Sequence, residues 1–219
     1  NLGIINWNSF SIGSDNTVNI NNGVGATMNR VTGQNVSEIY GNLNATGDAY
    51  LINQNGIVVG PNGVINTGGN FVASTRDITD EDFLNGGDQT FTGNSNADVV
   101  NLGQISTGGN AILLGKNVLN QGSINAGGDA LVGAGNEILL TDTTSAGDRM
   151  FVSVGEGSVT NAGTIEAVNA ELRANGGNVF ALAINNTGTV KATGLQEIGG
   201  KLVLSASTGT VENAGILDA

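Results

Sequence analysis

Short apolar runs separated by turn signals dominate the chain, and the stretch Tyr50–Thr75 shows this pattern in full. Gly and Asn tolerate the positive φ angles of tight turns, and Asn55-Gly56 and Asn62-Gly63 lie between the runs. The runs are two or three residues long: Leu51-Ile52, Ile57-Val58-Val59 and Val64-Ile65. A chain that bends this often cannot form a helix. The pattern predicts either a stack of hairpins or one coil of a β-solenoid.

Five stretches share a pattern close to Val-x-Asn-x-Gly-x-Ile, and they favour the solenoid. Their central residues are Asn101, Asn120, Asn161, Asn186 and Asn213. The intervals are 19, 41, 25 and 27 residues. A period near 20 residues is typical of a parallel β-helix, and the longest interval fits two coils or one coil plus an excursion. The asparagines either form a side-chain amide ladder or only tolerate a turn.

Each repeat continues through a glycine pair or a similar turn into a second apolar run. Such pairs are Gly68-Gly69, Gly108-Gly109, Gly127-Gly128 and Gly199-Gly200. Along a strand, inward side chains alternate with outward ones, and in a β-helix the inward set stacks on its equivalents one coil away. Eight or nine coils at a spacing of about 4.8 Å would make a rod of roughly 40 Å.

Two stretches interrupt this period, and we expect both to lie outside the coil, packed on one face. The first, near 76–98, is acidic and rich in Gly. The second, near 136–158, is predicted to be a hairpin in which Ile138–Thr141 and Met150–Val154 flank a TTSAGD turn. A smaller bulge is expected at Leu195–Gly200.

The N-terminal residues 1–42 lack the repeat and include aromatic side chains. The end of a solenoid exposes unpaired strand edges, so this region is predicted to cap coils that span 43–219. The repeat stops at Ala219 in mid-pattern, and we therefore expect the native protein to continue into more coils. The sequence predicts one all-β domain, 1–219: a right-handed parallel β-helix with an N-terminal β cap and two extra-helical β excursions.

Composition narrows the functional classes. The formal net charge is −12, and the seven Lys and Arg residues are scattered, so no basic stripe is present for nucleic acid or anionic lipid. Cys and His are absent, which excludes disulfides and thiolate metal sites and removes the commonest general base. No apolar run is long enough for a membrane-spanning helix, and no signal peptide is visible.

Five ordered segments resemble the N-terminal secretion domain of two-partner secretion exoproteins, the filamentous-haemagglutinin-like adhesins of Gram-negative bacteria. They are Ile5–Gly13, Asn29–Gly33, Ile39–Leu43, Leu51–Ile57 and Gly69–Thr75. The likeness covers essentially the whole chain, continues through Asp80–Leu84, and is greatest to the high-molecular-weight adhesin type. Gln54 replaces the Pro usual in the family, which leaves the turn formable but less rigid. Residues that normally precede the Trp7 segment are missing, including part of the family's cap.

The resemblance implies a secretion signal and folding nucleus for a large surface or secreted adhesin. Its partner would be an Omp85-type outer-membrane transporter of the two-partner secretion pathway, which recognises the extended chain through periplasmic domains. A host-cell receptor or glycan would bind the part of the protein beyond this chain. The location implied is the surface or exterior of a Gram-negative bacterium, reached through the periplasm and the outer membrane.

The resemblance also points to particular residues. The transporter-recognition or folding motif is Asn53, Gln54, Asn55, Gly56 and Ile57. The supporting family motif comprises Trp7, Phe10, Asn29, Arg30, Val31, Thr32 and Gly33. Asn53 and Asn55 are equally consistent with an ordinary turn in which their side chains bond nearby backbone. The two interpretations overlap, because a turn that must form for secretion is both.

We assign no catalytic residue, cofactor or metal. The acidic residues Asp77, Asp80, Glu81 and Asp82 cluster in the first excursion, but Ca²⁺ needs six to eight converging oxygens, so a solvated loop is expected. The carboxylate pairs Asp142 with Asp148, or Asp77 with Glu81, keep a β-helix polysaccharide-active enzyme as an alternative. Two non-enzymatic functions also stay open: a host-binding adhesin module in its own right, and a structural rod like a phage tail spike.

Overall fold

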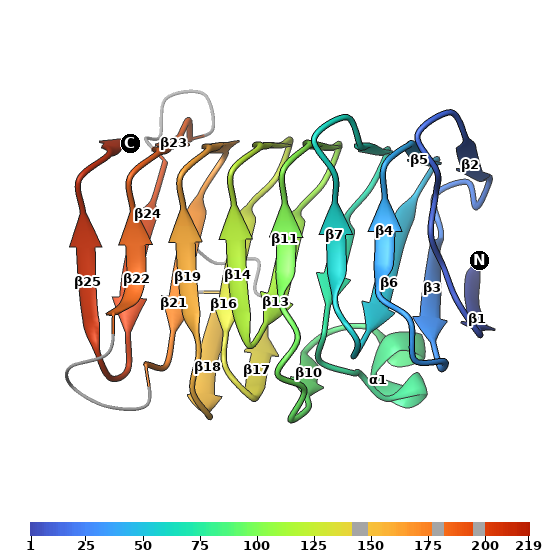
Figure 1. Cartoon of the computed structure of the whole chain (residues 1–219), viewed down its shortest axis with the longest axis horizontal. Coiled ribbons are helices and arrows are strands. Elements are labelled where there is room, and N and C mark those ends of the chain that lie inside the picture. Colours follow the sequence, from blue (N-terminus) through green and yellow to red (C-terminus); the bar gives the residue numbers. More distant parts are fainter. Residues whose placement is uncertain (142–148, 177–181, 195–199) are drawn as a thin grey trace.

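The computed structural model describes residues 1–141, 149–176, 182–194 and 200–219, and within them the chain winds through three parallel sheets. The coils follow one another along the long axis from the N-terminus to the C-terminus (Figure 1). The chain visits sheet A, sheet B and sheet C in turn. This is the all-β parallel β-helix that the repeat predicts, and the hairpin stack is excluded.

The strands of the three sheets have these bounds. Sheet A holds β1 (Leu2–Trp7), β3 (Ala26–Val31), β6 (Asp48–Asn53), β9 (Phe71–Ser74), β13 (Ala111–Gly115), β16 (Ala130–Ala134), β21 (Ala170–Ala174) and β24 (Leu202–Ala206). Sheet B holds β4 (Ser37–Ile39), β7 (Ile57–Val59), β11 (Val99–Asn101), β14 (Asn117–Asn120), β19 (Ser158–Asn161), β22 (Leu182–Asn186) and β25 (Thr210–Asn213). Sheet C holds β2 (Thr17–Ile20), β5 (Asn42–Ala45), β8 (Val64–Thr67), β12 (Gln104–Thr107), β15 (Ser123–Ala126), β20 (Thr164–Ala167), β23 (Thr189–Ala192) and β26 (Ile216–Asp218).

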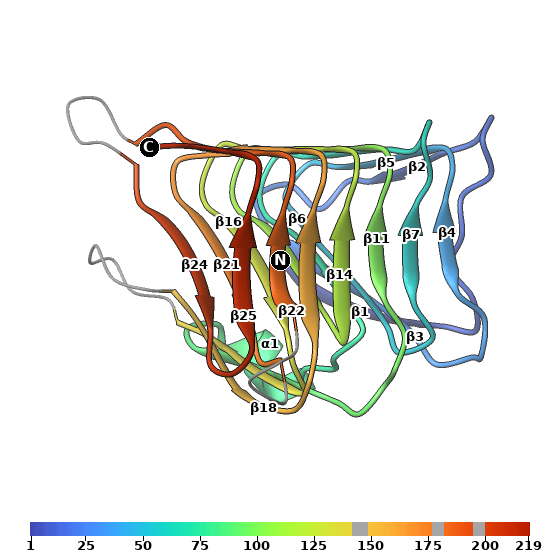
Figure 2. The same ribbon diagram turned by 60° about the vertical axis from the view of Figure 1, so that its left-hand side comes forward.

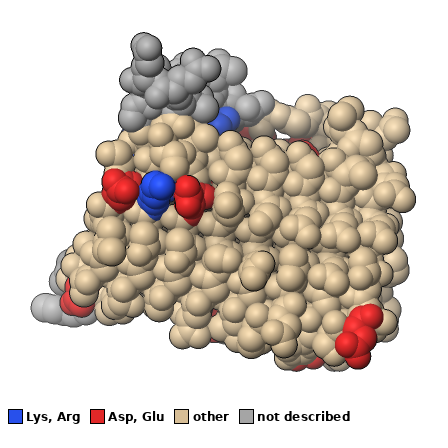
Figure 3. Space-filling model, turned by 90° about the horizontal axis from the view of Figure 1, so that it is seen from above, with Lys and Arg blue, Asp and Glu red and all other residues tan. Residues whose placement is uncertain are grey.

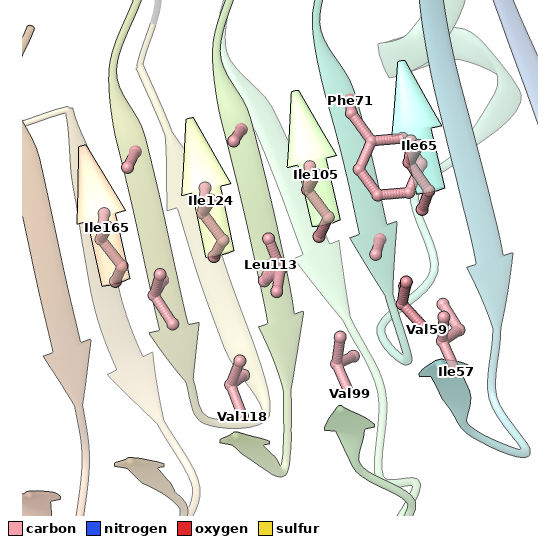
Figure 4. Packing of buried hydrophobic residues seen from close by; sticks show 14 of the residues in the cluster. Ile57, Val59, Ile65, Phe71, Val99, Ile105, Leu113, Val118, Ile124 and Ile165 are labelled. Atoms are coloured by element: carbon pink, nitrogen blue, oxygen red, sulfur yellow. The ribbon is translucent and has the colours of Figure 1, made fainter. Parts of the chain in front are cut away.

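The inward side chains stack in register from coil to coil. Ile105 pairs with Ile124, and Ile124 pairs with Ile165, so this row of isoleucines runs along the axis beneath sheet C (Figure 4). A second row, from Ile57 through Val99 to Val118, lines the inside of sheet B. These residues are at most 1% exposed, and their burial is the main source of stability.

A ladder of buried asparagines follows the corner between sheets B and C. The side-chain amide of Asn101 donates to Asn120 Oδ1, and that of Asn120 donates to Asn161 Oδ1, each across 2.8 Å. Asn161, Asn186 and Asn213 continue the ladder. The asparagines therefore do more than tolerate a turn: each satisfies the buried amide of a neighbour. The interval of 41 residues is one coil plus an excursion.

The strands within residues 1–42 pair into the same three sheets as the later coils. β1 pairs in parallel with β3, β2 pairs in parallel with β5, and Ile12 forms a parallel bridge with Ile39 in line with sheet B. The expected boundary at residue 42 therefore has no counterpart in the strand pairing. In these two coils Ile12 and Ile39 stand where later coils carry the asparagine of the ladder, and Val59 does so in the coil that follows.

Both predicted excursions are present, and both leave the coil between sheets A and B. β10 (Gln89–Thr92) comes from the first, and β17 (Glu137–Leu140) and β18 (Met150–Val154) come from the second. They pair as one antiparallel sheet in the order β10-β17-β18 and lie together on one side of the rod (Figure 2). The turn at 142–148 and most of the bulge expected at Leu195–Gly200 fall outside the described residues.

The first excursion also contains a short helix that the sequence pattern did not predict. α1 (Asp80–Asn85) begins after Thr79, whose side chain accepts a hydrogen bond from the Asp82 N–H. Acidic residues in the first turn suit the positive end of the helix dipole. The acidic cluster is therefore largely explained as a helix N-terminus. No helix in the described part of the chain is long and apolar enough to cross a bilayer.

The excursions cover the outer face of sheet A with a second apolar core. Tyr50, Ile52 and Val72 point away from the coil interior and pack with Phe83 and Phe91 of the first excursion, among others. Sheet C differs, because its outer face is polar: Asn44 donates to Asn19 and accepts from Asn66 there. The view from above shows few charged side chains on that side of the molecule (Figure 3).

Candidate functional site

The motif 53–57 forms the corner between β6 and β7, and Asn53 is its centre. Asn53 is fully buried. Its amide Nδ2 donates to the carbonyl of Asn35 and to Ser37 Oγ, both at 2.9 Å. Its Oδ1 accepts from the backbone N–H and from the side-chain amide of Asn55, also at 2.9 Å. Every polar atom of the side chain is satisfied, which fixes the turn against the preceding coil.

Asn55 and Gly56 complete the turn. Asn55 Nδ2 donates to the carbonyl of Gly33 at 2.8 Å, so the turn is tied to the end of the preceding corner. Gly56 adopts φ 117°, a conformation that costs an L-residue strain, and its N–H donates to the carbonyl of Asn53. Ile57 then starts β7 as a buried core residue, whereas Gln54 between the asparagines is exposed.

The motif 29–33 lies one coil earlier, directly beside the first. Trp7, Val31 and Asn53 occupy equivalent register positions in successive strands of sheet A. The Trp7 indole N–H donates to Asn29 Oδ1 at 3.1 Å, and the Asn29 amide donates to the carbonyl of Tyr50 at 3.2 Å. One buried asparagine therefore links three coils.

Thr32 and Gly33 fit closely against the first coil. The N–H and the hydroxyl of Thr32 both donate to the carbonyl of Trp7, at 2.8 and 3.1 Å. A Cβ on Gly33 would lie 2.0 Å from the carbonyl oxygen of Asn8, so the backbones approach more closely than any side chain permits. Trp7 in turn meets Phe10 edge to face, with ring centroids 5.6 Å apart.

Arg30 joins these coils to the first excursion. Its guanidinium donates to Asp77 Oδ1 at 2.9 Å, to Asp80 Oδ1 at 2.6 Å and to the carbonyl of Ile78 at 2.7 Å. Only 15% of the Arg30 side chain is exposed. Although burial opposes its charge, the two aspartates leave the pKa of Arg30 raised. Arg30 therefore anchors the start of α1 to the outside of sheet A.

The two motifs converge on one surface pocket of about 210 Å³. Its lining residues are Arg30, Val31, Thr32, Gly33, Ile52, Gln54, Asn55 and Asp77. Thr32 and Gln54 are the exposed polar residues of this lining. Several motif residues lie below the surface: Phe10, Val31 and Ile57 belong to the inner core, and Asn29 and Asn53 are buried hydrogen-bonding centres. Trp7 is exposed.

Residues outside both motifs also hold the site, and few sequence signals mark them. Ser37 accepts from Asn53, and the Ser95 hydroxyl donates to the carbonyl of Gln54. Arg76 is fully buried and donates to the carbonyl of Ser95 at 2.9 Å. An arginine directly after a buried strand was the one available sign. The contacts themselves come from distant segments.

The carboxylate pairs and the acidic cluster receive no geometric support as sites from the described residues. Asp77 is engaged by Arg30, and Glu81 belongs to the first turn of α1. Asp142 and Asp148 lie outside the part of the chain that the structure describes. Among described residues, no group of three or more acidic side chains is arranged to hold a metal ion. The corner at 53–57 combines a buried, hydrogen-bonded turn with one exposed side chain, Gln54.

Comparisons with known proteins agree with this architecture. The TPS secretion domain family matches residues 1–219. The HMW1 secretion domain from Haemophilus influenzae superposes with a TM-score of 0.84 at 32% identity, over 98% of this chain and 58% of that chain. The filamentous hemagglutinin secretion domain, 18% identical, shares the fold with a TM-score of 0.63 over 97% of this chain and 86% of its own.

A curated relative matches more locally. The heme/hemopexin-binding protein of Haemophilus influenzae is 41% identical over 76 residues, which is 34% of this chain and 8% of that protein. The chain thus spans a small part of its relative's length. Because the family match covers every residue, the conclusion is plain: this chain belongs to the TPS secretion domain family, the non-catalytic domain of two-partner secreted exoproteins.

Proposed function

We propose that this domain is the secretion signal and folding nucleus of a large surface or secreted adhesin, recognised by a cognate Omp85-type outer-membrane transporter through its periplasmic domains. The observation that carries the proposal is the convergence of the motifs 29–33 and 53–57 on one corner and one pocket. The family match supports it, because proteins of this family are secreted through a two-partner route.

Recognition acts mainly on the unfolded chain. Asn53 is completely buried once the coil closes, so a receptor can contact its side chain only before folding. An extended segment of this kind offers a row of free backbone groups to a sheet edge of the receptor, which is β-augmentation. The pocket rim at Thr32 and Gln54 is the part of the motif that stays accessible in the folded domain.

The same motif nucleates folding outside the cell. The side chains of Asn53 and Asn55 bond within the turn and to Gly33, Asn35 and Ser37. The first coils can therefore close as soon as residue 57 has emerged, without help from later segments. Each coil that folds outside prevents return of the chain, which biases transport outward without nucleotide.

The test is secreted yield of the full exoprotein with its transporter present, in Asn53→Ala and Asn55→Ala variants. We expect at least a tenfold loss for Asn53→Ala. Asn120→Ala is the matched buried control, because it removes comparable hydrogen bonds far from the motif. Asn44→Ala is the exposed control. A yield equal to the wild type in both motif variants would overturn the proposal.

A binding experiment separates recognition from folding. The unfolded domain should bind the isolated periplasmic domains of the transporter, and the Asn53→Ala and Asn55→Ala variants should bind at least tenfold more weakly. The alternative is that the motif is a purely structural turn. In that case the wild type and the variants would bind equally, and the secreted yield would fall in Asn53→Ala and in Asn120→Ala alike.

Haem binding is not carried over from the heme/hemopexin-binding relative. The match covers only 8% of that protein, so it does not indicate which part of the relative binds haem or hemopexin. The chain contains neither His nor Cys, two common axial ligands of haem iron. Absorption titration of the domain with haemin is expected to show no saturable site.

A further inference from the structure

The segment 93–98, which returns from β10 to β11, crosses the turn of the motif 53–57. The Ile57 N–H donates to the carbonyl of Asp98 at 3.1 Å, and the Ser95 hydroxyl donates to the carbonyl of Gln54. The backbone of 97–98 also faces Gly56: a Cβ there would lie 3.5 Å from Asp98 O and 3.6 Å from Ala97 Cβ. We call residues 93–98 the strap.

Arg76 holds the strap in place through hydrogen bonds. Its Nη1 donates to the carbonyl of Ser95 at 2.9 Å, and its Nε donates to the carbonyl of Gly135 at 2.6 Å. The planar guanidinium thus spans the strap and the start of the second excursion. A chain of hydrogen bonds runs from Gly135 through Arg76 and Ser95 to Gln54.

The second excursion fastens the strap independently at its other end. The Gly93 N–H donates to the carbonyl of Asn136 at 3.0 Å, and the Asn136 amide donates to Asn94 Oδ1 at 3.0 Å. β10, immediately before the strap, pairs with β17, immediately after Asn136. The strap therefore gains its two hydrogen bonds to Asn136 only when residue 136 arrives.

The identity of Arg76 is not explained by stability alone. The residue is fully buried, its guanidinium donates to carbonyl groups, and its Nη2 has no hydrogen-bond partner in the structure. Burial lowers the pKa of Arg76. These carbonyl groups compensate the desolvation of the buried charge less than a carboxylate would. The forked geometry, which reaches two carbonyls in different segments, is what only arginine supplies.

We propose that Arg76 is a positioning residue that locks the strap over the 53–57 turn. The Asn53 side chain leaves the receptor when the coil closes, and arrival of residues 135–136 outside the cell then secures the strap on the Ile57 N–H and the Gln54 carbonyl, which releases the backbone of the turn. The inference rests on the proposed function for the release step, whereas the locking step stands on the geometry. The motif first closes against residues 33–37. The strap closes over it later, when residue 136 has emerged from the transporter. Release is thus tied to completion of the second excursion.

Amide hydrogen exchange of the folded, full-length domain tests the locking step. In Arg76→Met the Ile57 amide, which bonds to the strap, should exchange at least tenfold faster than in the wild type. The Val64 amide, which bonds to Gly41 in the same coil, should keep its rate. Arg76→Lys should not restore protection, because an ammonium group lacks the fork. Lys191→Met, at an exposed ion pair, is the matched control and should change neither amide.

Two results overturn the locking step: an unchanged Ile57 rate in Arg76→Met, or full protection in Arg76→Lys. If Arg76→Met does not fold, Ser95→Ala takes its place, because it removes the hydroxyl bonded to Gln54 and leaves Arg76 intact. The same tenfold increase at Ile57 is then expected, and its absence counts against the lock.

Binding to the periplasmic domains of the transporter tests the release step. Unfolded wild-type domain should bind and folded wild-type domain should not, whereas folded Arg76→Met should retain binding at least tenfold tighter than folded wild type. Equal binding of the two folded proteins, despite faster Ile57 exchange, overturns release. If even the unfolded wild type fails to bind, the proposed function fails, and the exchange result still decides the lock.

Discussion

The side-chain amide of Asn120 donates to Asn161 Oδ1 across 2.8 Å, although 41 residues separate the two in sequence. The second excursion is therefore looped out of a single coil, and the ladder passes it without interruption. The same relationship makes the ladder vulnerable, because each asparagine serves both the coil before it and the coil after it.

Asn120→Ala should destabilise the domain by about 2–4 kcal/mol. The substitution leaves the buried Oδ1 of Asn161 without its donor, at about 1–3 kcal/mol. It also removes the hydrogen bond from Asn101 to Asn120, worth about 0.5–1.5 kcal/mol, and leaves the Asn101 amide with the carbonyl of Ser123 at 3.3 Å. Urea unfolding followed by circular dichroism measures the loss. Asn44→Ala, in the exposed row on sheet C, should change stability by less than about 0.5 kcal/mol. Similar losses in both variants would contradict a special role for the buried ladder.

Gly33→Ala should lower stability by about 1–3 kcal/mol or more, because its Cβ would collide with the carbonyl oxygen of Asn8 at 2.0 Å. The partner atom belongs to the backbone and cannot turn aside. Gly3→Ala is the matched control in β1, since no atom lies within 4 Å of its added Cβ. Thermal unfolding should show a lower midpoint for the first variant and an unchanged or slightly higher one for the second.

Stability should fall at alkaline pH through Tyr50. Burial under the first excursion raises the pKa of Tyr50, whose hydroxyl donates to Gln89 Oε1. The folded state thus holds the phenolic proton more tightly than the unfolded state, whose tyrosine titrates near pH 10. The contribution is complete below that pH and is lost as the pH rises through the folded-state pKa.

Unfolding free energies of the wild type and Tyr50→Phe, measured between pH 8 and pH 11, check this dependence. The wild type should lose stability above about pH 10, and Tyr50→Phe should lose clearly less. Tyr40→Phe is the control, because Tyr40 lies exposed on the surface and should leave most of the fall in place. Parallel curves for the wild type and Tyr50→Phe would show that Tyr50 does not govern the decline.

Arg30→Met should free α1 from the outside of sheet A and cost about 2 kcal/mol, because it leaves Asp77, Asp80 and the carbonyl of Ile78 without their cation. Hydrogen exchange across 78–92 should accelerate, while exchange within sheet C stays unchanged. Lys191→Met breaks an exposed ion pair with Glu166, which typically contributes about 0–1 kcal/mol. Equal effects of the two substitutions would argue against the anchor.

Most of the fold could be predicted from the sequence repeat. A period marked by Asn120 and its equivalents, followed by a second apolar run, predicts coils, and the interruptions of that period predict both excursions. The repeat does not mark the first coils, because Ile12, Ile39 and Val59 stand where the later coils have asparagine. Strand pairing there depends on backbone register and burial, neither of which requires a repeated residue.

The strands of sheet A held an unused signal. Runs such as Ala111–Leu114 are apolar at consecutive positions, which is typical of strands buried on both faces. That pattern predicts a cover on the outside of sheet A, and the excursions supply it. Thr79 followed by Asp82 is likewise a helix-start signal that marks α1.

The candidate site likewise contains residues that the sequence indicated and residues that it did not. Family likeness predicted both motifs, and the structure places Gly33 and Asn55 in direct contact. The likeness gave no sign of Arg76 or Ser95, because their partners lie 59 and 41 residues away. Contacts of that range arise from how coils and excursions stack, and no local pattern records them.

The second apolar core on sheet A has a consequence for how the molecule meets its neighbours. The two excursions cover the outer face of sheet A, whereas no other segment of the described chain forms a sheet over sheets B and C. A long, straight partner can contact the coils directly only along sheets B and C. Side-by-side contacts of the coils are therefore restricted to two of the three faces of the β-helix.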